Sequence, residues 1–254
     1  MKTSSLMRRG ALVGFAFSAM IFSASGVAAQ VIVLQSSVPQ YKAGKTLTKT
    51  DRVTIPEGGS MMVVLPSGAT RMISGPFEGQ VSGLSGGKTS NAALFKAVKK
   101  FVKTGGSTTK SVGAMRSISS RRAGGTKRAV KAKFSWTTVP ISARGDVCLE
   151  RGAAISLIRG KAGQALTVTV VDMQSSNRVK VRFEDGQKTV AWPSELALKN
   201  SSFAILPDGQ SMQQIRMRLI TPIPTPEQTL QVLHGQRCRM QFEAFLRGFL
   251  VSQR

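Results

Sequence analysis

The chain has 254 residues, enough for one large or two small domains with a substantial core. With 41% apolar and 19% charged residues its composition is globular, which excludes a wholly disordered or collagen-like protein. The 36 basic and 12 acidic side chains give a net charge of +24, so we expect an anionic partner.

Residues 1–29 have the three-part pattern of a secretory signal peptide. Lys2, Arg8 and Arg9 form a positive start, residues 11–22 are an apolar run, and residues 27–29 read Val-Ala-Ala. The run is shorter than the ~20 residues that a membrane-spanning helix needs. We therefore expect cleavage before Gln30, a periplasmic or secreted protein, and no transmembrane span after cleavage; an uncleaved anchor is the alternative.

The positive charge is concentrated in the middle of the chain. Residues 79–145 hold fourteen basic and no acidic side chains, whereas residues 30–78 carry +2 and residues 146–254 carry +5. This distribution divides the chain after the signal peptide into a β module at 30–84, a cationic helix with a flexible linker at 85–135, and a second β module with a C-terminal helix at 136–254. We expect a mainly β protein whose two small modules resemble sandwiches or barrels.

The first module is expected to be all-β. Apolar or β-branched runs at 31–34, 52–55, 61–65 and 70–74 predict strands, and Pro66-Ser67-Gly68 predicts a turn. The order of signals across residues 40–80, from Gly44-Lys45-Thr46-Leu47 through Gly58-Gly59-Ser60 to Ser74-Gly75-Pro76, resembles the β domain of the FecR-type family, the periplasmic part of ferric-citrate sensor regulators. The resemblance implies a periplasmic β module and not signalling through a membrane.

A cationic amphipathic helix is expected from residue 91 to about residue 103. Ser90 or Asn91 can cap its first turn, and Gly105 can adopt the left-handed conformation that ends it. Apolar residues and lysines recur on opposite sides, with Leu94, Val98, Phe101 and Val102 on one and Lys96, Lys99, Lys100 and Lys103 on the other. We expect the apolar side to pack on a β module; its insertion into an anionic membrane surface is the alternative.

Residues 104–133 are rich in Gly, Ser, Thr, Lys and Arg and contain no acid, so we expect them to be flexible. Together with the helix lysines, the basic residues assigned to an anionic surface here are Arg121, Arg122, Lys127 and Arg128. The partners considered are anionic lipid, surface polysaccharide and an acidic envelope protein, with a solvated linker as the alternative. Nucleic acid is disfavoured by export and because no aromatic residue is interleaved among the basic positions.

The second module is expected to have strands at 153–159, 166–171, 179–183, 189–192, 203–206 and 215–219. Asp185-Gly186 predicts a hairpin turn between the third and fourth of these. One long C-terminal helix is expected to begin after Thr225, with Pro226 at its first position. Its face of Cys238, Phe242, Phe245 and Phe249 predicts packing on the second sheet, and a partner-binding face is the alternative.

Cys148 and Cys238 are expected to form a disulfide that fastens the helix to the sheet, because paired cysteines are usual in exported chains. Two buried free thiols are the alternative, and Cys148 is expected to precede the main strands.

Two motifs resemble catalytic ones. Ser85 lies in a G-x-S-x-G pattern, but no hydrophobic strand precedes it as a nucleophile elbow requires, and the chain's one histidine is His234. Gly87-Lys88-Thr89 resembles the end of a phosphate-binding loop, yet Ser82 stands where the first glycine belongs. We therefore expect a non-catalytic binding or scaffold protein of the bacterial cell envelope, without cofactor or metal. The alternatives are an enzyme or enzyme regulator acting on an envelope polymer, or an adaptor to a membrane-bound sensor.

Overall fold

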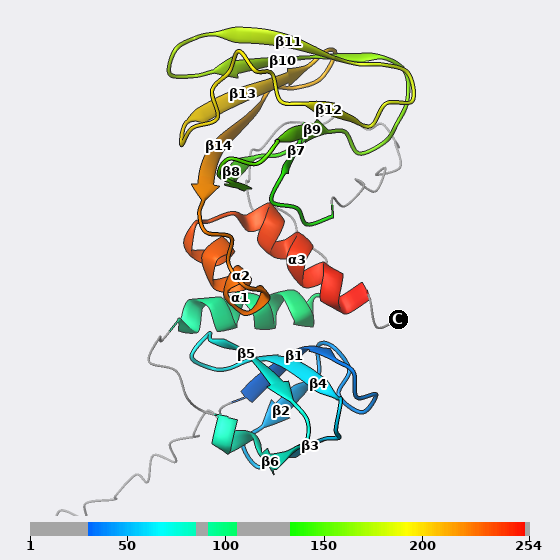
Figure 1. The fold of residues 1–254 in the computed structure, drawn as a ribbon, viewed down its shortest axis with the longest axis vertical. Coiled ribbons are helices and arrows are strands. Elements are labelled where there is room, and N and C mark those ends of the chain that lie inside the picture. The colour runs from blue at the N-terminus through cyan, green and yellow to red at the C-terminus, as the bar shows by residue number, and fades with distance from the viewer. Residues whose placement is uncertain (1–29, 85–90, 106–132, 252–254) are drawn as a thin grey trace, which may run out of the picture.

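The structure is a computed structural model that describes residues 30–84, 91–105 and 133–251. The predicted signal peptide, Ser85, Lys88 and most of the predicted cationic linker, with Arg121, Arg122, Lys127 and Arg128, lie outside these ranges. The described chain is mainly β and elongated, with a β structure at each end and three helices between them (Figure 1). The mainly β prediction with a helical C-terminus is confirmed.

The N-terminal β structure contains an antiparallel sheet in the order β2-β1-β4-β5. Its strands are β1 (Gln30–Ser36), β2 (Thr46–Thr48), β4 (Ser60–Val64) and β5 (Thr70–Ser74). A separate pair, β3 (Arg52–Ile55) and β6 (Phe77–Gln80), leads into the short 3-10 helix η1 (Val81–Leu84). Pro66-Ser67-Gly68 forms the expected turn between β4 and β5, with the Gly68 N–H donating to the Leu65 carbonyl at 2.8 Å.

Both faces of the two central strands of this sheet, β1 and β4, are buried. Val31 and Val33 of β1 belong to a core cluster on one face, while Ile32 and Leu34 belong to a second cluster on the other. Because side chains alternate along a strand, a strand covered on both sides has a continuous apolar run. This explains why residues 31–34 and 61–65 read as unbroken apolar segments.

The helix α1 (Ala92–Lys103) covers one of these faces. The Asn91 Oδ1 atom accepts a hydrogen bond from the Leu94 N–H at 3.1 Å, so Asn91 is the capping residue. Gly105 follows the helix with a φ of +60°, as expected. The predicted helix and its packing are confirmed.

The C-terminal β structure has two sheets around one core. The larger, ordered β11-β10-β13-β14-β8, consists of β8 (Gly145–Glu150), β10 (Leu166–Asp172), β11 (Arg178–Phe183), β13 (Ser202–Pro207) and β14 (Gln213–Ile220). The smaller, ordered β12-β9-β7, consists of β7 (Thr138–Pro140), β9 (Ser156–Ile158) and β12 (Thr189–Ala191). Leu157, Val168 and Phe203 are fully buried in the core that the sheets share.

The predicted hairpin at Asp185-Gly186 is wrong. The turn exists, with Gly186 at a φ of +71°, but β11 pairs with β10 whereas β12 pairs with β9 in the other sheet. The buried guanidinium of Arg159 donates hydrogen bonds to the carbonyls of Glu184 and Gln187 at 2.9 and 2.6 Å. These bonds hold the turn against the segment after β9, so the chain crosses to the second sheet.

The expected single C-terminal helix is two helices, α2 (Pro226–Gly235) and α3 (Arg239–Val251). The Cys238 N–H donates to the Leu233 carbonyl and the Arg237 N–H to the His234 carbonyl, the bond pair of a Schellman motif. Arg237 takes the left-handed position of this motif with a φ of +61°. The helix begins at Pro226 as predicted, although the Thr225 side chain makes no capping hydrogen bond.

The three helices form a layer between the two β structures (Figure 1). One apolar cluster combines side chains of β1 and β4 with α1, α2, α3 and Cys148 of β8. The α3 helix contacts both β1 and β8. The helices therefore join the two ends of the molecule through a common core.

Candidate functional site

Four lysines of α1, which we call the lysine face, lie on its solvent side: Lys96, Lys99, Lys100 and Lys103. All four are exposed, and the Lys99 Nζ donates to Gln30 Oε1 at 2.8 Å. The described structure thus brings together all the predicted anion-binding residues of the helix. The predicted arginines and lysine of the linker lie outside it.

The apolar side of α1 is committed to the protein interior. Leu94 and Val98 are 0% exposed and Phe101 is 7% exposed, within the cluster shared by β1, β4, α2 and α3. Membrane insertion of this side, the alternative weighed from the sequence, is wrong because the side chains already face other parts of the chain. The lysine face can act only through charge and hydrogen bonding.

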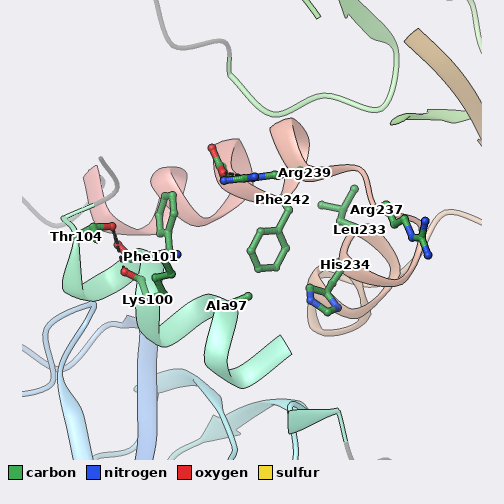
Figure 2. Close-up of a pocket in the computed structure, with 10 residues that line it drawn as sticks. Ala97, Lys100, Phe101, Thr104, Leu233, His234, Arg237, Arg239 and Phe242 are labelled. Carbon is green, nitrogen blue, oxygen red and sulfur yellow. Dashed lines mark hydrogen bonds and ion pairs between the residues drawn. The ribbon is translucent and has the colours of Figure 1, made fainter. Parts of the chain in front are cut away.

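A pocket of about 460 Å³ opens between α1 and the corner where α2 meets α3 (Figure 2). Its lining residues are Ala97, Lys100, Phe101, Thr104, Leu233, His234, Arg237, Arg239, Phe242 and Glu243. Lys100 belongs to both the pocket and the lysine face. The two features are therefore continuous.

The pocket has an apolar wall. Phe101, Leu233 and Phe242 are buried, and in Figure 2 the rings of Phe101 and Phe242 both lie in the space between α1 and α3. The His234 ring is inclined against Phe242, with 5.8 Å between the ring centroids. Such a surface favours contact with a hydrocarbon or aromatic group.

The rim of the pocket is cationic. Glu243 is paired with Arg239 at 3.0 Å and approaches Arg247 at 3.9 Å. Burial lowers the pKa of Arg247, and the Glu243 carboxylate opposes this shift. Lys100 and Arg237 have no acidic side chain within ion-pair distance in the described ranges, so the rim has an excess of positive charge.

The disulfide between Cys148 and Cys238 is confirmed, with Cα atoms 5.8 Å apart and a sequence separation of 90 residues. Cys148 precedes most strands of this β structure along the chain, as expected, but it also lies in a strand itself, β8, which pairs in parallel with β14. Cys238 lies between α2 and α3, beside Arg237. The bond therefore fixes the corner that forms one side of the pocket.

The phenylalanines considered for a partner-binding helix are used within the chain. Phe242 is buried, and Phe245 makes edge-to-face contacts with Phe134 and Phe249 at 4.9 Å. The α3 helix packs on β8 as expected, and also on β1. The rings are thus occupied by internal packing.

The most perturbed carboxylate has a structural role. The pKa of Asp172 is lowered to about 2 by the backbone N–H of Gln174 and by Lys199, whose Nζ lies 2.9 Å from Oδ2. It is buried and closes the turn after β10. Among the described residues no group of three or more His, Cys, Asp or Glu side chains is arranged to hold a metal ion.

No family model, curated protein or solved structure matches the chain. The resemblance of residues 40–80 to the FecR-type β domain is unsupported and stays a prediction. Across the described residues, no helix has the length and apolar character needed to cross a membrane.

Sequence reasoning missed Arg237 and Arg239 as site residues. They join the pocket because the chain reverses between α2 and α3, and a left-handed arginine carries no sequence signal comparable to glycine. A second exposed basic group, Arg178 and Lys180 on the edge strand β11, lies at the far end of the molecule from α1 (Figure 1). It provides a comparison surface for tests of charge.

Proposed function

We propose that this protein is a non-catalytic, exported binding protein of the bacterial cell envelope that docks reversibly on an anionic lipid surface through the lysine face. The observation that supports it is a row of four exposed lysines on a helix whose opposite side is anchored in the core. Because the helix is held by packing, its charges keep a fixed arrangement without a partner. Docking then costs little ordering of the backbone.

Electrostatics supply enough free energy for reversible docking. A lysine near an anionic lipid surface contributes about 1 kcal/mol, and the attraction is screened over ~8 Å at physiological salt. From Lys96 to Lys103 the helix rises by roughly 10 Å, so neighbouring headgroups can be contacted together. Binding of this kind is peripheral and sensitive to salt.

Export is supported by the disulfide, because such bonds persist in oxidising compartments. The signal-peptide pattern of residues 1–29 supports it independently. A FecR-like role for residues 40–80 is part of this proposal and rests on the resemblance alone. We expect the exported protein to have an intact mass that lacks residues 1–29.

The test is sedimentation of the oxidised protein with phosphatidylglycerol-containing vesicles and with neutral phosphatidylcholine vesicles, at low and high salt. We expect binding to the anionic vesicles alone and release at high salt. Reversal of the lysine face, Lys→Glu at positions 96, 99, 100 and 103, should weaken binding at least about 100-fold. The matched control reverses four exposed basic residues of the C-terminal β structure, Arg178, Lys180, Lys188 and Arg216.

If the control weakens binding as much as the lysine-face variant, net charge and not the helix mediates docking, and the proposal fails. The proposal also fails if the protein does not bind anionic vesicles but binds an acidic polysaccharide such as alginate, or an acidic protein. Equal sedimentation with neutral vesicles would likewise contradict it.

A further inference from the structure

The pocket between α1 and the α2–α3 corner combines apolar walls with a cationic edge. Neither a bare ion nor an uncharged hydrocarbon would contact both. Its volume of about 460 Å³ is within the usual range for small-molecule sites, roughly 300–1,000 Å³. Its walls come from three helices that are fixed by a common core and by the Cys148–Cys238 disulfide. The cavity is therefore formed before any ligand binds.

Apolar contact is available on two sides of the cavity. Phe101 and Ala97 of α1 face Leu233 of α2 and Phe242 of α3 across it. Figure 2 shows the Phe242 ring directed into this space from above and Ala97 below it. An occupant gains from burying carbon here, and a bare phosphate or sulfate would find few donors on these walls.

Charge is available at the edge of the same cavity. Lys100 and Arg237 line it at opposite ends (Figure 2), and in the described ranges neither is paired with a carboxylate. Arg239 is also at the edge, but its charge is balanced by Glu243 at 3.0 Å. A ligand with an acidic head would be attracted to the two unbalanced cations, whereas a cationic head would be repelled.

We propose that this pocket binds an organic acid with an apolar body, placing its hydrocarbon between Phe101 and Phe242 and its carboxylate at Lys100. The site goes beyond the proposed lipid docking, since it requires a cavity and not a surface. A body of roughly ten carbons suits a pocket of this class. Decanoate is the simplest probe of that chemistry.

The test measures displacement of 1-anilinonaphthalene-8-sulfonate from the oxidised protein. Four competitors separate the contributions: decanoate, decyltrimethylammonium with the same chain and opposite charge, 1-decanol with no charge, and inorganic phosphate with no chain. We expect decanoate to compete at least about tenfold better than the cation or the alcohol, and phosphate not to compete. Equal competition by all three decyl compounds would overturn the proposal.

Variants then locate the site. Ala97→Phe fills the cavity without opening a new one and should weaken decanoate binding by about tenfold or more. Ala92→Phe is the matched control, because Ala92 is exposed on the same helix and does not line the pocket. Unchanged decanoate affinity in Ala97→Phe, with an unchanged melting temperature, would place the site elsewhere and refute the proposal.

Charge removal is tested with Lys100→Met and Arg237→Gly. Arg237→Gly suits the left-handed backbone at this position, so the variant is expected to fold. Lys100→Met should weaken decanoate binding about threefold to tenfold, Arg237→Gly should weaken it less, and neither should affect 1-decanol binding. An equal loss of affinity for both ligands in Lys100→Met would contradict the role of charge. Reversal of Lys96, Lys99 and Lys103 should impair vesicle docking but leave decanoate affinity unchanged, so the two proposals can fail separately.

Discussion

The side-chain amide of Gln241 on α3 makes hydrogen bonds to both backbone polar groups of Cys148 on β8. Its Oε1 accepts from the Cys148 N–H at 2.7 Å, and its Nε2 donates to the Cys148 carbonyl at 2.6 Å. The same nitrogen donates to the carbonyl of Ser135 at 2.8 Å. β8 is an edge strand, so no neighbouring strand is available on its outer side. The Gln241 side chain supplies the hydrogen bonds that such a strand would make at Cys148.

Replacement of Gln241 with leucine should lower the free energy of unfolding by about 2–4 kcal/mol. The buried N–H and carbonyl of Cys148 would lose their partner, and an unsatisfied buried group costs about 1–3 kcal/mol. Urea denaturation followed by circular dichroism measures the effect. Gln231→Leu, at an exposed position of α2, is the control and should change stability little.

Removal of the disulfide by Cys148→Ala with Cys238→Ala should destabilise the protein by about 4–5 kcal/mol. In the chain-entropy model, a bond that closes a loop of this length restricts the unfolded chain by about that amount. The urea midpoint of the double variant should equal that of the reduced wild-type protein. An unchanged midpoint in both would show that the bond contributes no stability.

Arg159 is a buried cation that bonds only to carbonyl oxygens. Its guanidinium donates to the carbonyls of Gly163, Gln164, Glu184 and Gln187 at 2.6–2.9 Å and lies 5.4 Å from the centre of the Phe183 ring. Arg159→Met removes the guanidinium donor from all four carbonyls, of which those of Gly163 and Glu184 still accept from a backbone N–H, and should cost about 3 kcal/mol or more. Arg159→Lys should recover only part of this loss, because an ammonium cannot reproduce the planar fork.

Thermal unfolding of the Arg159 variants should be compared with Arg151→Met, where the arginine is exposed. We expect the exposed variant to melt within a few degrees of wild type. If the melting temperature of Arg159→Met is also within a few degrees of the wild-type value, contacts other than Arg159 hold the loop between β11 and β12.

Acid should weaken the protein through Asp172. Its folded pKa of about 2 is below the unfolded value of 3.8, so the unfolded state binds a proton first as the pH falls. The associated stability, at most about 2 kcal/mol, is fully present above about pH 5 and is lost as the pH falls toward 2. Asp172→Asn should therefore be less stable than wild type at pH 7, with a difference that shrinks in urea melts at pH 2–4; a constant difference would contradict this assignment.

Local sequence signals predicted several strands and the helix α1. The runs at 52–55 and 70–74 coincide with β3 and β5, and α1 follows from its apolar spacing and its Asn91 cap. The strands β2, β6, β7 and β8 were missed because they are defined by pairing with other segments of the chain. Pairing of this kind depends on tertiary contacts that no local window contains.

The lysine face was predictable because it depends only on helical spacing. The pocket was not, because it requires Lys100 of α1 to meet Arg237 and Phe242 from a segment more than a hundred residues away. The reversal of the chain at Arg237, between α2 and α3, brings these residues to the pocket. Gly235 two residues earlier is the usual signal for such an end, but it lies inside α2.

The core shared by β1, β4 and the three helices affects how the chain can be divided. A fragment ending near residue 105 would expose Leu34 and Met62 on the side where α2 and α3 normally lie, and a fragment from residue 133 would expose Leu230 and Phe242. Each piece would thus present the surface that the other needs. Two halves produced as separate chains should associate with one another, which makes this protein suited to fragment complementation.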